Sequence, residues 1–80
     1  MAVKLVFLGK LADLAGGAER AVAGPLDWTG LLAALPADLA AEIAGEKVRL
    51  AANGTVLPDK TALRAADGDE IALLPPVSGG

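Results

Sequence analysis

The sequence predicts an α+β fold in which a mixed sheet carries a layer of helices on one face. Three observations support this prediction: β-prone segments open the chain, a helical stretch follows, and alternating apolar segments return in the second half. Eighty residues suffice for a single domain with one core. Because 54% of the residues are hydrophobic but only Phe7 and Trp28 are aromatic, we expect that core to be aliphatic.

Two strands with a helical turn between them are predicted at the start of the chain. Residues 3–8 are β-prone and alternate between two faces. Leu11 and Leu14 can cover one side of a single helical turn, which Gly16-Gly17 would end. Residues 18–23 form a weaker strand candidate. The N-terminal residues expected to face the core are Val3, Leu5 and Phe7.

The middle of the chain is predicted to form two short helices. Asp27 can accept hydrogen bonds from the free N–H groups that open a helix over residues 28–35. Pro36 is tolerated in the first turn of a second helix, because its missing N–H would have no partner there. In that helix Leu39 and Ile43 lie four residues apart and share a face. Together these segments give the helical layer.

The second half of the chain is predicted to return to strands. Residues 48–52 alternate, and Asn53-Gly54 offers the two positive-φ positions of a hairpin turn that leads back through residues 55–57. Residues 69–74 alternate again, with Glu70, Ala72 and Leu74 away from the core. Ile71 and Leu73 are expected to face the core, and in the earlier strand Val48, Leu50 and Ala52 alternate with Lys47, Arg49 and Ala51.

Composition excludes several classes of function. The chain has no cysteine and no histidine, which removes thiol nucleophiles, Cys/His zinc sites and the commonest proton-transfer side chain. A net charge of −3 with scattered Lys and Arg argues against a nucleic-acid surface and against binding to anionic lipid. Asp67, Asp69 and Glu70 surround a turn glycine, which is typical of a solvated loop, so no metal site is expected.

No stretch approaches the roughly 20 apolar residues needed to span a bilayer. The apolar run at the N-terminus is short and is followed at once by Lys10 and Asp13, unlike a signal peptide. We therefore expect a cytoplasmic protein.

The end of the chain is its most informative feature. Pro75-Pro76 favours an extended exit from the last strand, because two prolines donate nothing to a sheet ladder. Gly79-Gly80 leaves no side chain next to the terminal carboxylate. Such an end can enter a narrow active site on another protein. The extended tail is residues 75–80: Pro75, Pro76, Val77, Ser78, Gly79 and Gly80.

Residues 63–80, with their Asp-Gly-Asp-Glu turn and Pro-Pro-Val-Ser-Gly-Gly end, resemble the C-terminal signature of the ubiquitin-like sulfur carriers, specifically the small subunits of molybdopterin synthase. Residues 3–9 and 50–55 are similar to that family too. Ala12-Asp13 departs from it, since many relatives carry an Arg-acid pair there.

This resemblance implies a β-grasp fold over residues 1–74 and a non-catalytic role in molybdenum cofactor biosynthesis. An adenylating, E1-like activating enzyme would use ATP on the carboxylate of Gly80, and sulfur would then replace AMP to give a thiocarboxylate. The loaded tail would donate that sulfur for the dithiolene in the large subunit of molybdopterin synthase, with which a heterotetramer is expected. The chain itself would bind no cofactor.

The resemblance also implies that Leu8, Val56 and Leu74 contact the protein partners, although isolated exposed leucines are common on any surface. Other functions stay open. A thiamine-pathway sulfur carrier ends in Gly-Gly as well, a ubiquitin-like modifier shares the activation chemistry, and a plain interaction domain would leave the tail inert.

Overall fold

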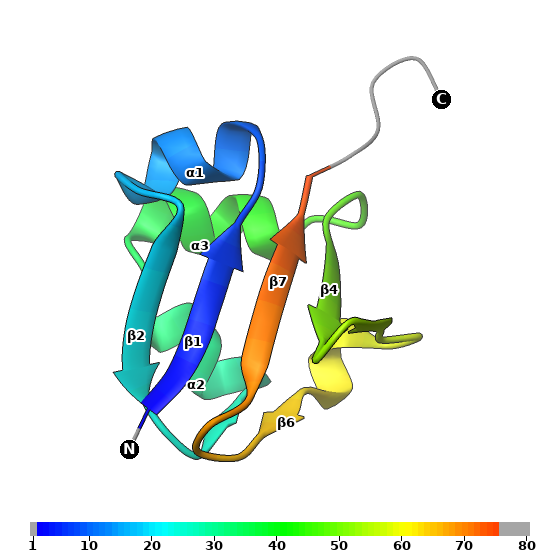
Figure 1. Ribbon diagram of the computed structural model, residues 1–80. Helices are drawn as coiled ribbons and strands as arrows, with labels where there is room; N and C mark the ends of the chain where they lie inside the picture. The colour runs from blue at the N-terminus through cyan, green and yellow to red at the C-terminus, as the bar shows by residue number, and fades with distance from the viewer. Residues whose placement is uncertain (1, 76–80) are drawn as a thin grey trace.

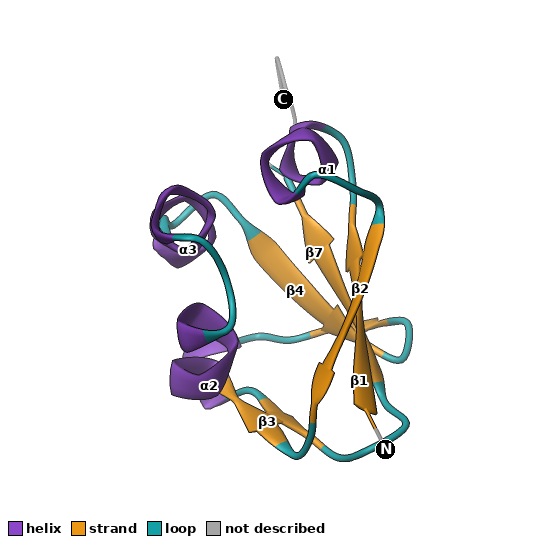
Figure 2. Ribbon diagram, turned by 90° about the vertical axis from the view of Figure 1, so that its left-hand side faces the viewer, coloured by secondary structure: helices purple, strands orange, loops and turns teal. Residues whose placement is uncertain are grey.

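A five-stranded mixed sheet forms one face of the molecule, and helices cover the other (Figures 1 and 2). The computed structural model describes residues 2–75. The strand order is β2-β1-β7-β4-β5. Strands β1 and β7 run parallel at its centre, and the other neighbours are antiparallel. The predicted α+β class, with its helical layer on one face, is confirmed.

The two central strands present alternate side chains to the core, as predicted. Strand β1 spans Ala2–Phe7 and strand β7 spans Glu70–Leu74. Their parallel register pairs Leu5 with Ile71, and these side chains are fully buried. The buried core of the described residues is apolar throughout. It comprises Val3, Leu5, Phe7, Leu11, Leu26, Leu31, Leu35, Leu39, Ile43, Val48, Leu50, Ala51, Leu63, Ala65, Ile71 and Leu73.

The predicted helical turn after β1 is a short helix, α1, at Lys10–Ala15. It ends at Gly16, whose φ of 77° is the left-handed conformation that glycine adopts at little cost. The two leucines expected on one side of this turn differ in burial, because Leu11 is fully buried and Leu14 is 40% exposed. Three helical residues turn through roughly 300°, which leaves Leu14 rotated away from the buried Leu11. Strand β2, Glu19–Ala23, then pairs with β1.

Both middle helices form close to their predicted positions. Helix α2 spans Trp28–Ala33, and the Asp27 carboxylate caps it by accepting from the N–H of Gly30 at 2.7 Å. Helix α3 spans Ala37–Ala44. Pro36 is the residue before its first turn and not part of that turn.

The predicted hairpin pairs β4, Arg49–Ala52, with β5, Thr55–Val56. One detail differs from strict alternation. Ala51 points away from the helices yet is only 5% exposed, because Ala72 and Val56 lie beside it on the two neighbouring strands. Ala52, on the other face of β4, packs against the core and is partly buried.

A second sheet of two short strands was not predicted. Strand β3, Leu26–Asp27, pairs with β6, Arg64–Ala65, and buries Leu26 and Ala65 at the end of the main sheet where β7 begins (Figure 1). A 3-10 turn, η1, at Lys60–Ala62 precedes β6. Two donors of Thr61 bind the Asp59 carboxylate ahead of that turn and lower the pKa of Asp59.

Lys60 ties this second half to the end of α3. Its ammonium donates to the carbonyl oxygens of Ile43 and Val48, both at 2.8 Å, and also to that of Gly45. It lies 5.8 Å from the centre of the Trp28 ring. Partial burial is the largest cause that lowers the pKa of Lys60. This side chain therefore satisfies carbonyl groups that the end of a helix leaves free.

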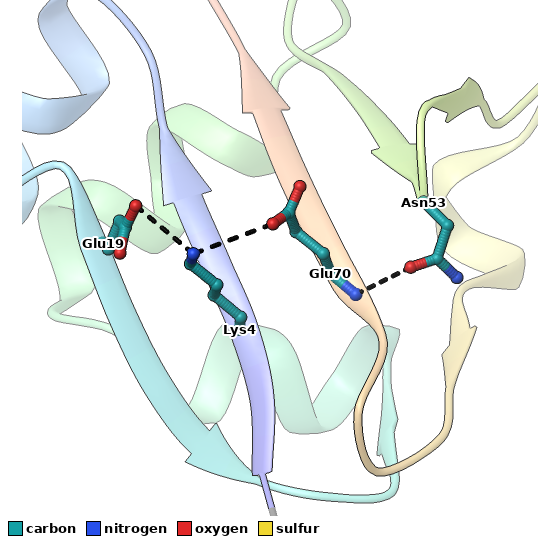
Figure 3. A network of polar contacts seen from close by, with 4 residues as sticks. All are labelled: Lys4, Glu19, Asn53 and Glu70. Atoms are coloured by element: carbon teal, nitrogen blue, oxygen red, sulfur yellow. Dashed lines mark hydrogen bonds and ion pairs between the residues drawn. The ribbon is translucent and has the colours of Figure 1, made fainter.

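Asn53 joins the hairpin turn to the start of β7, the strand that leads to the tail (Figure 3). Its φ is 49°, which an asparagine tolerates in a turn of this kind. The side-chain oxygen accepts from the N–H of Glu70 at 2.9 Å, and the side-chain nitrogen donates to Asp69 at 3.2 Å. The backbone N–H of Asn53 donates to the Glu70 carbonyl at 2.8 Å.

We expect Asn53→Ala to lower the free energy of unfolding by about 2 kcal/mol, because it removes both side-chain bonds and strains the backbone at positive φ. Asn53→Gly should cost about 1 kcal/mol, since glycine loses the same bonds but accepts that φ. Urea unfolding followed through Trp28 fluorescence measures both values. Unchanged stability in both variants would contradict this role of the Asn53 amide.

Candidate functional site

The chain leaves the sheet at the end of β7, the middle one of the five strands (Figure 1). Leu74 ends the strand, and Pro75 follows it half-buried. Pro75 has no N–H to donate, so the ladder cannot continue through it. The other predicted tail residues, Pro76, Val77, Ser78, Gly79 and Gly80, lie outside the described residues.

The face of the sheet away from the helices carries a row of apolar side chains. The register places Val6 beside Ala72, Ala72 beside Ala51, and Ala51 beside Val56. This row crosses four strands, and its two middle members contribute only methyl groups. We call it, together with Leu8 and Leu74, the outer-face patch: Val6, Leu8, Ala51, Val56, Ala72 and Leu74.

The structure brings two of the predicted contact residues together at the root of the tail. The Leu8 N–H donates to the Leu73 carbonyl at 3.3 Å, which places Leu8 beside the end of β7 and close to Leu74. Leu8 is 42% exposed, and Leu74 is half-buried. Val56 is 48% exposed on β5, at the far end of the apolar row. All three lie on the outer face of the sheet, which includes Leu74 at the end of β7.

Sequence reasoning did not identify Val6, Ala51 and Ala72 as members of this surface. Alternation indicated that Val6 and Ala72 point away from the core. Only the strand order shows that they are neighbours, because β7 is inserted between β1 and β4.

Charged side chains border the outer-face patch on strands β2, β1 and β7. Lys4 lies between two carboxylates, 3.4 Å from Glu19 and 3.8 Å from Glu70 (Figure 3). All three side chains are about half exposed, so these ion pairs add little to stability. At the tail end of the same face, Arg49 stands opposite Leu74. Lys4 and its two carboxylates thus border the patch across β2, β1 and β7, and Arg49 borders it beside Leu74.

Residues 2–75 contain neither a metal-ligating cluster nor a membrane-spanning helix. No group of three or more His, Cys, Asp or Glu side chains in this range could hold a metal ion. Asp69, which the sequence places in an acidic turn, binds the Asn53 side chain and the N–H of Ala66. No helix in the described part of the chain is long and apolar enough to cross a membrane.

Comparison with known proteins gives matches over nearly the whole chain. The ThiS family matches residues 5–80. The comparison with curated proteins gave no match.

Among solved structures, SAMP1 from Haloferax volcanii is 29% identical with a TM-score of 0.71, and the match covers 100% of both chains. Small archaeal modifier protein 1 from Methanosarcina acetivorans is 26% identical, with a TM-score of 0.73 and coverage of 99% of this chain and 96% of that one. A chain from the complex of subunits 1 and 2 of molybdopterin-converting factor from Helicobacter pylori is 26% identical, with a TM-score of 0.67 and full coverage of both chains. The shared fold is the ubiquitin-like β-grasp.

Proposed function

The chain belongs to the ThiS family, and on this premise we propose that it is a non-catalytic sulfur carrier whose working group is the carboxylate of Gly80. The observation that carries the proposal is that the family match extends to residue 80 and so includes Gly79-Gly80. A terminus without side chains fits a narrow active site, and the β-grasp domain presents it from the middle of a sheet.

The proposed chemistry has two steps on Gly80. A carboxylate is a poor acyl donor, so one of its oxygens first attacks the α-phosphorus of ATP in an E1-like activating enzyme, and pyrophosphate leaves. A sulfur donor at the oxidation level of sulfide then attacks the carbonyl carbon. AMP departs with the electrons of the broken C–O bond, and a thiocarboxylate remains as a soft nucleophile. The chain needs no bound cofactor for this role, because ATP is a substrate of its partner.

The proposed recipient of the sulfur is the large subunit of molybdopterin synthase, acting in the cytoplasm. The likeness to a chain of the Helicobacter pylori subunit 1 and 2 complex supports this recipient, because the match covers all of both chains. In this role the tail enters the large subunit and supplies sulfur for the dithiolene of molybdopterin. We propose a heterotetramer of two small and two large subunits as the working assembly.

The outer-face patch is the proposed docking surface for both protein partners. Two of its members, Leu8 and Leu74, lie next to the point where the chain leaves the sheet, so a partner that contacts them is close to the start of the tail. Val56 extends the same apolar row toward the edge of the sheet. Apolar anchors that become fully covered carry most of the binding energy in protein interfaces, which suits half-exposed side chains of this size.

A second candidate function is covalent modification of other proteins through Gly80. The likeness to SAMP1 from Haloferax volcanii and to small archaeal modifier protein 1 from Methanosarcina acetivorans favours it. Both functions begin with activation of Gly80 by ATP. They differ in the nucleophile that then attacks the Gly80 carbonyl: a sulfur donor in the carrier, a lysine amine in the modifier. A thiamine-pathway carrier is the third possibility within the same chemistry.

Deleting the gene in its own organism separates these functions. A molybdopterin carrier predicts loss of molybdoenzyme activity, with growth restored by neither thiamine nor its precursors. A thiamine-pathway carrier predicts a thiamine requirement with molybdoenzymes intact. A modifier predicts the disappearance of covalent conjugates detected with an antibody to the chain. Unchanged molybdoenzyme activity would overturn the molybdopterin proposal.

A further inference from the structure

Gly9 occupies a backbone conformation and a position that no other residue type fits well. Its φ is 56° and its ψ is −134°, in the positive-φ half of the map that L side chains rarely adopt. A Cβ added to Gly9 would lie 3.1 Å from Cγ of Pro75, closer than nine in ten real Cβ contacts, so the ring would have to shift by a few tenths of an ångström. The proline ring that begins the tail therefore lies over the space that a Gly9 side chain would need.

The backbone around Gly9 is fixed on both sides. Before it, the Leu8 N–H donates to the Leu73 carbonyl of β7 at 3.3 Å, and the Leu8 carbonyl accepts from Leu11 at 3.1 Å. The Gly9 carbonyl itself accepts from the N–H of Ala12 at 3.1 Å as helix α1 begins. Gly9 thus lies between the central ladder and the first turn of a helix, which leaves this short segment little freedom to move.

Pro75, in contrast, lies where the ladder has ended. It has no N–H with which to bond a neighbouring strand, so packing of its ring is what can fix the direction of the chain after Leu74. The ring is half-buried, and the nearest atom to the missing Gly9 side chain is its Cγ. If a methyl group were added at Gly9, the Pro75 ring would have to move. The backbone of Leu8 and Gly9 would not, because its hydrogen bonds hold it in place.

We infer that Gly9 is a positioning residue. Because it has no side chain, the Pro75 ring can pack beside it, and this packing sets the direction in which the tail is presented to the activating enzyme. The expected effect on sulfur loading rests on the proposed function, but the packing of Pro75 beside Gly9 can be measured on the isolated chain. The proposed role of Gly9 is exercised through Pro75.

The chain offers a matched control for Gly9→Ala. Gly16 also has positive φ, 77°, and also flanks helix α1, but nothing lies within 4 Å of a Cβ added there. Gly16→Ala therefore introduces backbone strain without touching the tail. Pro75→Ala supplies the second control. It removes the Cγ atom and leaves the Pro75 Cβ at 3.9 Å, an ordinary contact distance, so it should relieve the clash in Gly9→Ala.

The first measurement is NMR on the isolated chain. The wild type is expected to show a nuclear Overhauser contact between the Gly9 α-protons and the Pro75 ring. Gly9→Ala should shift the amide signals of Leu74 and Val77, whereas Gly16→Ala should leave both in place. Slow exchange of the Leu8 N–H in all variants would show that the ladder beneath is intact. Absence of the contact in the wild type would overturn the inference, whatever the function of the chain.

The second measurement is the kcat/KM of sulfur loading by the activating enzyme. We expect a loss of about tenfold or more for Gly9→Ala, because a displaced reactive end costs catalysis steeply. Gly16→Ala should stay within about twofold of wild type, and Gly9→Ala should have little further effect in a Pro75→Ala background. Equal rates for Gly9→Ala and Gly16→Ala would contradict the positioning role. If the wild type failed to accept sulfur, the proposed function would be contradicted. The NMR contact would still decide whether Pro75 packs beside Gly9.

Discussion

Removal of Gly80 is expected to lower sulfur loading by at least about a hundredfold, because the remaining carboxylate of Gly79 ends one residue, roughly 3.5 Å, short of the position the activating enzyme requires. The stability of the domain should not change, since the buried residues of the described structure lie between Val3 and Leu73. Single-turnover kinetics with ATP and a sulfur donor measure the first effect, and thermal unfolding measures the second.

Two variants control for the length and composition of the tail. Appending one alanine after Gly80 keeps a terminal carboxylate but moves it outward, and we expect a similar loss. Ser78→Ala keeps the length and the terminus and removes one hydroxyl, so it should cost far less loading than the loss of Gly80. A chain without Gly80 that loads sulfur normally would show that the terminal position is not the reacting one.

Leu8→Glu is expected to weaken binding to the large subunit of molybdopterin synthase by on the order of 100-fold, or about 2.7 kcal/mol. The substitution places a charge in the outer-face patch beside the root of the tail, where a docked partner would exclude the water that solvates it. Because Leu8 is 42% exposed in the free chain, folding should be affected little. Isothermal titration calorimetry with the purified large subunit gives the affinity.

Leu14→Glu is the matched control for this experiment. Leu14 is the same residue type and is 40% exposed, but it belongs to α1, on the helical side of the sheet (Figure 2). Its substitution should leave the affinity unchanged. Val56→Glu, at the other end of the apolar row, should weaken binding as Leu8→Glu does. Equal affinities for the Leu8 and Leu14 variants would rule out the outer face as the docking surface.

Local pattern predicted much of this fold. Alternation identified the core-facing residues of β1 and β7, because a strand with one buried face must place apolar side chains at every second position. The Asp27 cap could be predicted because its carboxylate is the nearest acceptor for N–H groups that the helix leaves free. In these elements the local preference and the tertiary structure agree.

Other elements depend on contacts that no local pattern contains. Strands β3 and β6 have two residues each, too few for a periodicity, and each exists because it pairs with the other. Lys60 is an unremarkable lysine in sequence. Its role follows from the end of α3 lying next to η1.

Only part of the candidate site could be predicted, because some of its features are local in sequence and others arise from strand pairing. The Pro-Pro and Gly-Gly pairs of the tail are visible in the sequence, and the resemblance indicated Leu8, Val56 and Leu74. The continuous row from Val6 to Val56 requires the parallel pairing of β1 with β7, which joins the two ends of the chain. Gly9 gave no local signal beyond being a glycine before a helix, because its contact with Pro75 arises only from that pairing.

Tandem mass spectrometry of the C-terminal peptide tests the central claim most directly. The chain is incubated with its purified activating enzyme, ATP and a sulfur donor, and then digested. The account predicts an oxygen-to-sulfur mass increase that fragmentation assigns to Gly80 and that disappears when ATP is omitted. A terminal peptide that never gains sulfur under these conditions, or sulfur found on another residue, would contradict it.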